Sequence, residues 1–189
     1  MRERPNRHDW KSCEVKASVG SNPTLSAFFA YFNGAFLKMF NYESLMELAI
    51  KEAQLSLEHD DVPVGALVLD KNGEVISSGH NEKEFSKDPT SHGEILAIRS
   101  AATICGSWHL DEMTLISTLE PCAMCAGAIV ASRMKRLVFG AYDLKAGACG
   151  SLMNVASDSR LNHQVETVGG VLETECSMLL KEFFLKKRK

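Results

Sequence analysis

Several features that would assign a chain to a common class are missing from this sequence. Its 189 residues carry a net charge of only −3, so no overall positive charge marks it as a nucleic-acid-binding protein. No apolar run approaches the length of about 20 residues that a membrane span needs. The most apolar stretch, residues 25–40, is interrupted by Asn33, Gly34 and Lys38 and has no convincing cleavage site. We therefore interpret it neither as a membrane span nor as an export signal.

The sequence also lacks the cysteine spacing of a disulfide framework. Of its six cysteines, only Cys122 and Cys125 form a short C-x-x-C motif. No second C-x-x-C and no H-x-x-x-H completes the four-ligand set of a structural zinc site. Free thiols suit a reducing compartment, so we predict a cytoplasmic protein.

Two short motifs carry the chemistry of the chain: His92-Gly93-Glu94 and Pro121-Cys122-Ala123-Met124-Cys125. One imidazole and two thiolates provide three ligands for a tetrahedral Zn²⁺, which leaves the fourth position open for water, as in catalytic zinc sites. On a helix, side chains three residues apart share a face, so Cys122 and Cys125 can bind one metal ion. Glu94 then remains as a carboxylate that is free to carry a proton.

The spacing of the first motif indicates where this site lies. His92 and Glu94 are two residues apart, so they can converge only over the start of the helix that residues 95–102 favour. A lone C-x-x-C also fits a redox pair or half of a structural zinc site, and a lone His-x-Glu also fits a capped surface helix. The two motifs together favour a catalytic site with one Zn²⁺ per chain, faced by two helix N-termini that lower the thiol pKa values.

Helix-like and strand-like stretches alternate along the chain from Tyr42 onward. Strands that alternate with helices predict an α/β fold, here three layers (α/β/α) around a mixed sheet of about five strands with one antiparallel hairpin. In such sheets, sites form at the carboxyl ends of strands. The predicted helices are 43–57, one after His92, one through the cysteines to about 132 and one from 173; the predicted strands are 64–69, 74–79, 113–118, 136–141 and 164–168.

From about Tyr42 to its end, the chain resembles the bacterial tRNA-specific adenosine deaminase family, within the cytidine-deaminase-like superfamily. The resemblance depends on several segments that match in order, in addition to the two zinc motifs. Two departures are Gly93, where the family commonly has Ala, and Ala146, where Thr is common. The matching segments are 62–66, 79–81, 88–90, 119–128, 138–141, 147–152, Asn162-His163 and Phe183-Phe184.

The resemblance implies hydrolytic deamination of the wobble adenosine of a tRNA anticodon to inosine, with release of ammonia. It implies that zinc is held by His92, Cys122 and Cys125, and that Glu94 moves a proton from the activated water to the base. It also implies a homodimer that binds the tRNA anticodon stem-loop.

Four further residues are implied as substrate-binding residues. Asn81 matches the position that hydrogen-bonds the base, and Asp143 and Lys145 belong to the loop that meets the anticodon. Phe184 belongs to the C-terminal segment 181–189, whose paired aromatics and cations can stack on bases and meet phosphates. The alternative for this segment is a solvated helix end whose cations complement the helix dipole.

Other functions remain open at this stage. A deaminase of the same fold could act on guanine, a cytosine nucleotide or a riboflavin precursor, although the riboflavin enzymes space their second cysteine farther from the first. A non-catalytic, zinc-stabilised RNA-binding subunit is a further alternative, but it would not need Glu94.

Residues 1–38 have no counterpart in the family and no core pattern. The string from Gly20 to Ala27 can be written in codons that match the T arm of a bacterial tRNA gene. We therefore expect residues 1–38 to be a disordered extension or the product of a mis-assigned start, with translation from Met39 and a zinc-binding deaminase-type domain over 39–189. Met46 is the alternative start. The alternative is a genuine extension or an anchor formed by the aromatic run at 28–40.

Overall fold

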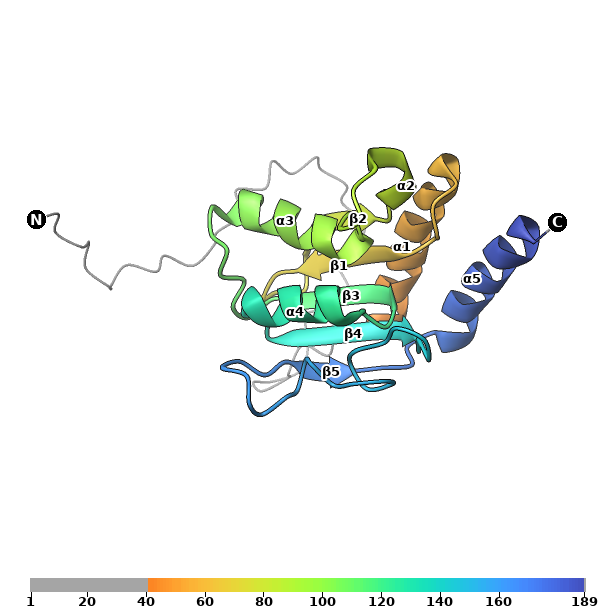
Figure 1. Ribbon diagram of the computed structural model, residues 1–189. Helices are drawn as coiled ribbons and strands as arrows, with labels where there is room; N and C mark the ends of the chain where they lie inside the picture. The colour runs from red at the N-terminus through yellow and green to blue at the C-terminus, as the bar shows by residue number, and fades with distance from the viewer. Residues whose placement is uncertain (1–40, 189) are drawn as a thin grey trace, which may run out of the picture. The chain divides into compact units, whose positions relative to one another are not determined.

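The computed structural model describes residues 41–188, so the expectation for residues 1–38 lies outside the described residues. Within this range the chain forms helices and strands in the predicted alternation (Figure 1). No helix of the described part is long and apolar enough to cross a membrane. In chain order the elements are α1 (Tyr42–Leu55), the 3-10 helix η1 (Ser56–His59), β1 (Gly65–Leu69), β2 (Val75–His80), α2 (Lys83–Ser86), α3 (Gly93–Cys105), β3 (Thr114–Leu119), α4 (Ala123–Ala131), β4 (Arg136–Ala141), β5 (Glu166–Val168) and α5 (Glu173–Lys187).

The sheet has five strands in the order β2-β1-β3-β4-β5. Strand β1 is antiparallel to both β2 and β3, whereas β3, β4 and β5 run parallel to one another. The prediction of a mixed sheet of about five strands, with one antiparallel hairpin and a parallel part, is therefore confirmed. The carboxyl ends of β3 and β4 lie side by side, with Leu119 opposite Ala141.

Helices cover both faces of this sheet, as the three-layer prediction requires. Helices α1 and α5 pack on one face, where Met46 and Cys176 meet sheet residues such as Ile116 and Val138. Helices α3 and α4 pack on the other face, where Ala97 and Ile129 belong to the larger apolar cluster. Every residue of β1 is buried, which fits its central place between β2 and β3.

The chain between α1 and β1 differs from the prediction. The helix expected over 43–57 ends at Leu55, and a 3-10 turn follows to His59. Asp60 then takes a left-handed conformation with φ 61°, which ends the helical run.

Helix α2 was not predicted, because four residues carry no periodic signal. The buried carboxylate of Asp61 holds its first turn by accepting hydrogen bonds from the backbone N–H groups of Glu84 (2.8 Å) and Phe85 (3.1 Å).

Candidate active site

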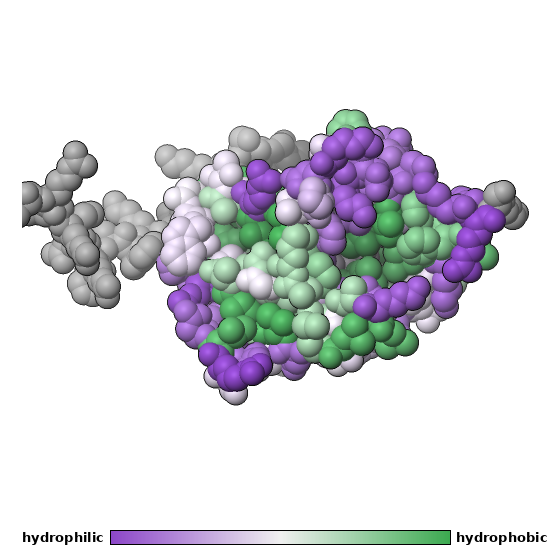
Figure 2. Space-filling model, viewed as in Figure 1, coloured by the Kyte–Doolittle hydropathy of each residue, from purple (hydrophilic) through white to green (hydrophobic). Residues whose placement is uncertain are grey.

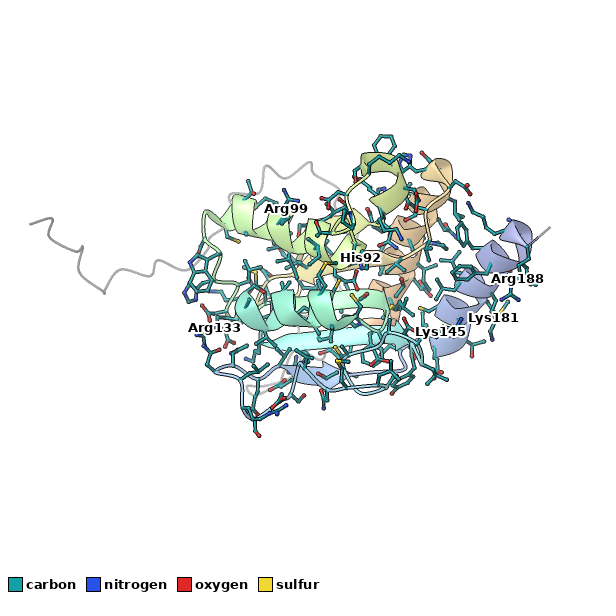
Figure 3. All side chains as sticks on the ribbon, in the orientation of Figure 1. His92, Arg99, Arg133, Lys145, Lys181 and Arg188 are labelled. Carbon is teal, nitrogen blue, oxygen red and sulfur yellow. The ribbon has the colours of Figure 1, made fainter. Side chains whose placement is uncertain are left out.

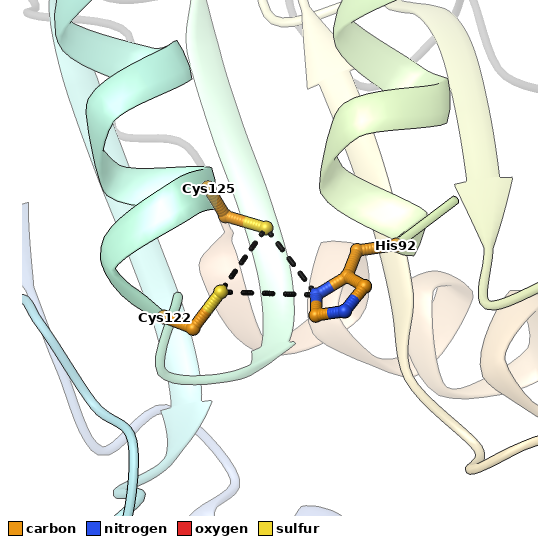
Figure 4. Close-up of side chains that lie close together, drawn as sticks. All are labelled: His92, Cys122 and Cys125. Atoms are coloured by element: carbon orange, nitrogen blue, oxygen red, sulfur yellow. Dashed lines mark hydrogen bonds between the residues drawn. The ribbon is translucent and has the colours of Figure 1, made fainter. Parts of the chain in front are cut away.

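His92 and Cys122 occupy equivalent positions at the starts of two helices. His92 is the N-cap residue of α3 and Cys122 is the N-cap residue of α4, both with extended backbone angles. Neither side chain makes the capping hydrogen bond that is usual at this position, so both are free to project beyond the helix ends. Figure 4 shows that they point to one place, where Cys125 joins them from the first turn of α4.

The three ligand atoms form a compact triangle. The distance between the Sγ atoms of Cys122 and Cys125 is 3.7 Å, and the Nδ1 atom of His92 lies 3.8 Å and 3.6 Å from these two sulfurs, respectively. Zn–S bonds of about 2.3 Å and Zn–N bonds of about 2.0 Å in a tetrahedron place the ligand atoms about 3.5 to 3.8 Å apart. The ligand types and their separations therefore fit a zinc ion. Among the described residues this is the one cluster of His, Cys, Asp and Glu side chains suited to a metal.

The protonation of the triangle also suits metal binding. Hydrogen bonds from the Cys125 thiol and from His92 lower the pKa of Cys122 to about 3, which favours its thiolate form. The hydrogen bond with Cys122 and burial raise the pKa of Cys125, which therefore holds the proton of the cysteine pair. The hydrogen bond with Cys122 likewise raises the pKa of His92. A metal ion at this point would replace these shared protons as the partner of both sulfurs.

Glu94 lies in the first turn of α3, beside the triangle. Its side chain is 3% exposed, and its Oε2 atom has no hydrogen-bond partner among the described residues. Burial raises the pKa of Glu94 above its usual value. A buried carboxylate oxygen without a partner is costly, and it indicates a site built for a water or substrate atom next to the metal ligands.

A cavity of about 180 Å³ opens above these groups. Its walls come from the segment before β1, the end of β2, the starts of α3 and α4, and the loop after β4. The residues that line it are Asp61, Val62, Val64, Asn81, Lys83, His92, Glu94, Leu119, Glu120, Cys122, Asp143 and Ala146. Its convergent polar groups, next to three metal-ligating side chains, are those of a ligand site.

Asn81 makes two hydrogen bonds that hold the start of α3 in place. Its Nδ2 atom donates to the carbonyl of Val62 (3.0 Å), and its Oδ1 atom accepts from the N–H of Gly93 (2.9 Å). A Cβ atom added to Gly79 would lie only 2.6 Å from the carbonyl oxygen of Gly93, which shows how closely the start of α3 approaches β2. One N–H of the Asn81 amide remains for a ligand in the cavity.

The other predicted substrate-binding residues lie in different places. Asp143 lines the cavity, and its Oδ1 atom accepts from the backbone N–H groups of Lys145 (2.9 Å) and Ala146 (3.2 Å). Lys145 is exposed and does not line the cavity. Asp61 and Lys83 also line the cavity and were not predicted as site residues. Asp61 lies in the loop before β1, and Lys83 begins the unpredicted helix α2.

Phe184 lines a second hollow of about 530 Å³, between η1, α2 and α5. This hollow shares Asp61, Val62 and Lys83 with the first cavity, so the two are neighbours. Lys187 forms an ion pair with Asp60 at its edge. The remaining lining residues are His59, Glu84, Lys87 and Phe183.

Comparison with known proteins is consistent with this geometry. A family model for MafB19-like deaminases matches residues 40–188. A tRNA-specific adenosine deaminase of Bacillus subtilis is 49% identical over 147 residues, which cover 78% of this chain and 91% of the relative. A solved structure from work on A-to-I editing by tRNA:A34 deaminases superposes with a TM-score of 0.69 at 39% identity, and the match covers 72% of this chain and 99% of that chain. A guanine deaminase of Bacillus subtilis gives a TM-score of 0.54 at 34% identity over 59% of this chain and 71% of that chain.

Proposed function

This chain belongs to the MafB19-like deaminase family and, within it, to the tRNA-specific adenosine deaminases, and we propose that it converts the wobble adenosine of a tRNA anticodon to inosine. The observation that carries the proposal is the buried, unpartnered carboxylate oxygen of Glu94 beside a three-ligand cluster. A structural zinc site needs neither an open coordination position nor a proton carrier. The non-catalytic RNA-binding alternative does not account for that carboxylate.

His92, Cys122 and Cys125 would hold one Zn²⁺ per chain, because their atoms fit its bond lengths. When bound, zinc supplies the Lewis acidity that brings the pKa of water close to neutrality. Glu94 takes a proton from the attacking water and delivers it to the ring nitrogen as the new C–O bond forms. It then carries the proton of the newly added hydroxyl group to the exocyclic amine. The C–N bond breaks as the C=O bond of inosine forms, and ammonia leaves.

Burial of Glu94 suits both steps of this transfer. Burial raises the pKa of its carboxyl group, which brings the group closer to the working pH and makes it able both to accept and to release a proton. Asn81 presents its remaining N–H to the base, and its two other hydrogen bonds fix the amide in that orientation.

The hollow beside the cavity is suited to the nucleotides next to the edited base. It combines the rings of Phe183 and Phe184 with the cations of Lys83, Lys87 and Lys187. Aromatic rings stack on bases of any sequence, and lysines meet phosphates. Figure 3 shows that Lys145, Lys181 and Arg188 lie toward this end of the molecule, whereas Arg99 and Arg133 lie toward the other end.

Removal of residues 186–189 is expected to weaken binding of an anticodon stem-loop and to leave turnover of saturated enzyme unchanged. Each lost phosphate contact should make the slope of log affinity against log salt shallower by about 0.7. Fluorescence anisotropy at several salt concentrations measures that slope. Arg99→Ala, which removes a cation at the far end, is the control. An unchanged affinity and slope in the truncated protein would mean that these residues only end a helix.

Asn81→Ala is expected to lower kcat/KM by about 10- to 100-fold, since a buried hydrogen bond to the base and the support of α3 are lost together. RNA affinity should change little, because phosphate contacts lie elsewhere. Asn81→Asp separates the two effects. It keeps the acceptor for the Gly93 N–H, which supports α3, and removes both amide donors, the one to the Val62 carbonyl and the one proposed to meet the base. If Asn81→Asp turns over like the native enzyme, Asn81 does not donate to the base.

We also propose that the protein acts as a homodimer. Helix α4 carries no charged residue, and its outer side presents Ala123, Gly127 and Ala131, where an added Cβ on Gly127 would meet nothing within 4 Å. Figure 2 shows apolar surface over this helix. Exposed apolar surface of this kind favours association, and a second copy could border the active site there.

A cytoplasmic location is proposed on chemical grounds. Cys122, Cys125, Cys149 and Cys176 are free thiols, as expected in a reducing compartment. Its substrate, tRNA, is found in the same compartment.

A comparison of substrates tests the proposed activity. The purified zinc-loaded protein is given an anticodon stem-loop with a wobble adenosine, free adenosine, guanine and cytidine in separate reactions, and ammonia release is measured. We expect turnover with the stem-loop alone. Turnover of guanine without turnover of the stem-loop would favour the guanine deaminase alternative. The structural similarity to the Bacillus subtilis guanine deaminase is the reason for including guanine.

A further inference from the structure

Glu120 is a buried carboxylate that lies two residues before the zinc ligand Cys122 and takes no part in the chemistry described above. Only 2% of its surface is exposed, although it follows directly after β3 at the edge of the active-site cavity. Its backbone N–H donates to the carbonyl of Ala141 at the end of β4 (2.8 Å). The residue is therefore fixed to the sheet at the start of the short segment that joins β3 to Cys122.

The carboxylate accepts four hydrogen bonds from one loop, which runs from Asp143 to Ser151. Oε1 accepts from the backbone N–H groups of Cys149 (3.0 Å) and Ser151 (2.9 Å). Oε2 accepts from the backbone N–H of Asp143 (3.1 Å) and from the hydroxyl of Ser151. The loop has no regular secondary structure, so its two ends are tied together through this one side chain.

The same loop is also tied to the zinc-ligand segment. The N–H of Ala148 donates to the carbonyl of Pro121 (2.9 Å), and Gly147 forms a β-bridge with Cys122. A Cβ atom on Gly147 would lie 2.4 Å from Oε2 of Glu120, so the loop backbone wraps directly around the carboxylate. Asp143 and Ala146 of the loop 143–151 line the active-site cavity, and Cys122 lines it as well.

We propose that Glu120 is a positioning residue that fixes the substrate-facing wall, residues 143–151, at a set distance from the zinc ligand Cys122, and so determines how tightly the RNA substrate binds. The role rests on the proposed function only for the identity of that substrate. The hydrogen bonds that define it hold whatever the substrate is. Glu120 does not touch the reacting atoms, so its loss should affect binding of the substrate more than the rate of the bound complex.

Glu120→Gln tests this role with almost no change in side-chain volume. An amide has one acceptor atom, whereas the loop offers donors to both carboxylate oxygens. In the better of its two orientations, the amide oxygen faces the N–H groups of Cys149 and Ser151. The amide NH₂ group then faces the N–H of Asp143, and two donors oppose each other. The hydroxyl of Ser151 can rotate to accept, so the contact that is lost is the one at Asp143.

Two measurements on the full chain give the outcome. Backbone amide exchange followed by NMR should show the N–H of Asp143 exchanging about tenfold faster in Glu120→Gln, with the amides of β3 unchanged. With an anticodon stem-loop, KM should rise about tenfold while kcat stays within about threefold and zinc content stays at one per chain. Glu74→Gln removes an exposed carboxylate far from the site and serves as the control for loss of one charge.

Other results would overturn the proposal. Unchanged exchange at Asp143 with unchanged KM would mean that Glu120 only fills space, and loss of zinc would mean that it supports the ligand helix instead. If Glu120→Gln fails to fold, Ser151→Ala removes one of the four donors without creating opposed donors. It should shift exchange and KM in the same direction by a smaller factor, and no shift in either would contradict the role. Failure of the proposed function would appear separately, as absence of stem-loop turnover in the native protein while the exchange result still stands.

Discussion

Glu94→Gln is expected to lose deaminase activity by a factor of at least about 10² to 10⁴, the usual contribution of a positioned acid–base group. The amide keeps the size of the carboxyl group but cannot take a proton from water or return one to the leaving amine. The Glu94 side chain is buried, and no solvent-exposed group can replace it at the same place. Single-turnover measurements with an anticodon stem-loop give the rate of the chemical step directly.

Binding should separate from chemistry in this variant. Zinc content and stem-loop affinity should match those of the native protein, because Glu94 is neither a ligand atom of the triangle nor part of the hollow that holds the flanking nucleotides. Glu94→Asp keeps the charge but withdraws it by one methylene, and should recover part of the rate. Near-native turnover of Glu94→Gln would remove the proton carrier from the mechanism.

Replacement of either metal-ligating cysteine is expected to have the second large effect. Cys122→Ala or Cys125→Ala leaves two protein ligands, so metal and activity should be lost together. Cys125 is fully buried, so its variant should also unfold at a lower temperature. Elemental analysis and thermal unfolding measure both effects.

Cys105→Ala is the matched control for these cysteine variants. Cys105 is the last residue of α3, at the opposite end of that helix from His92. This variant should keep one zinc per chain and native turnover. Full zinc occupancy in Cys122→Ala or Cys125→Ala would show that the ligand set is wrong.

The ligand triangle could be predicted because its three ligands belong to two short motifs at helix starts. These motifs converge once both helices lie on the same face of a sheet, and the alternation of strands and helices predicts that layering. The strand order was not predicted and is known only from the structure. The fold class followed from the same alternation. The prediction for β4 agrees with the structure at both ends, since the apolar run Leu137–Ala141 follows Arg136 directly and ends before polar residues of the next loop.

The rest of the site depends on contacts between distant segments, which periodicity does not report. Helix α2 exists because Asp61 caps it from before β1, and the loop after β4 is shaped by Glu120 from the end of β3. A charged residue at the end of a buried strand was the available signal for Glu120. The double hydrogen bonding of Asn81, and the place of Phe184 in a separate hollow, likewise follow only from the packed structure.

The most direct test of the account is the identity of the base at the wobble position after reaction. A tRNA anticodon stem-loop with adenosine at that position is incubated with the zinc-loaded protein, digested to nucleosides and separated by liquid chromatography with mass detection. We predict that inosine appears in amounts equal to the ammonia released, and that a stem-loop with adenosine only at other loop positions gives none. Inosine formed equally from adenosines at any loop position, or no inosine with a full complement of zinc, would contradict the proposed function.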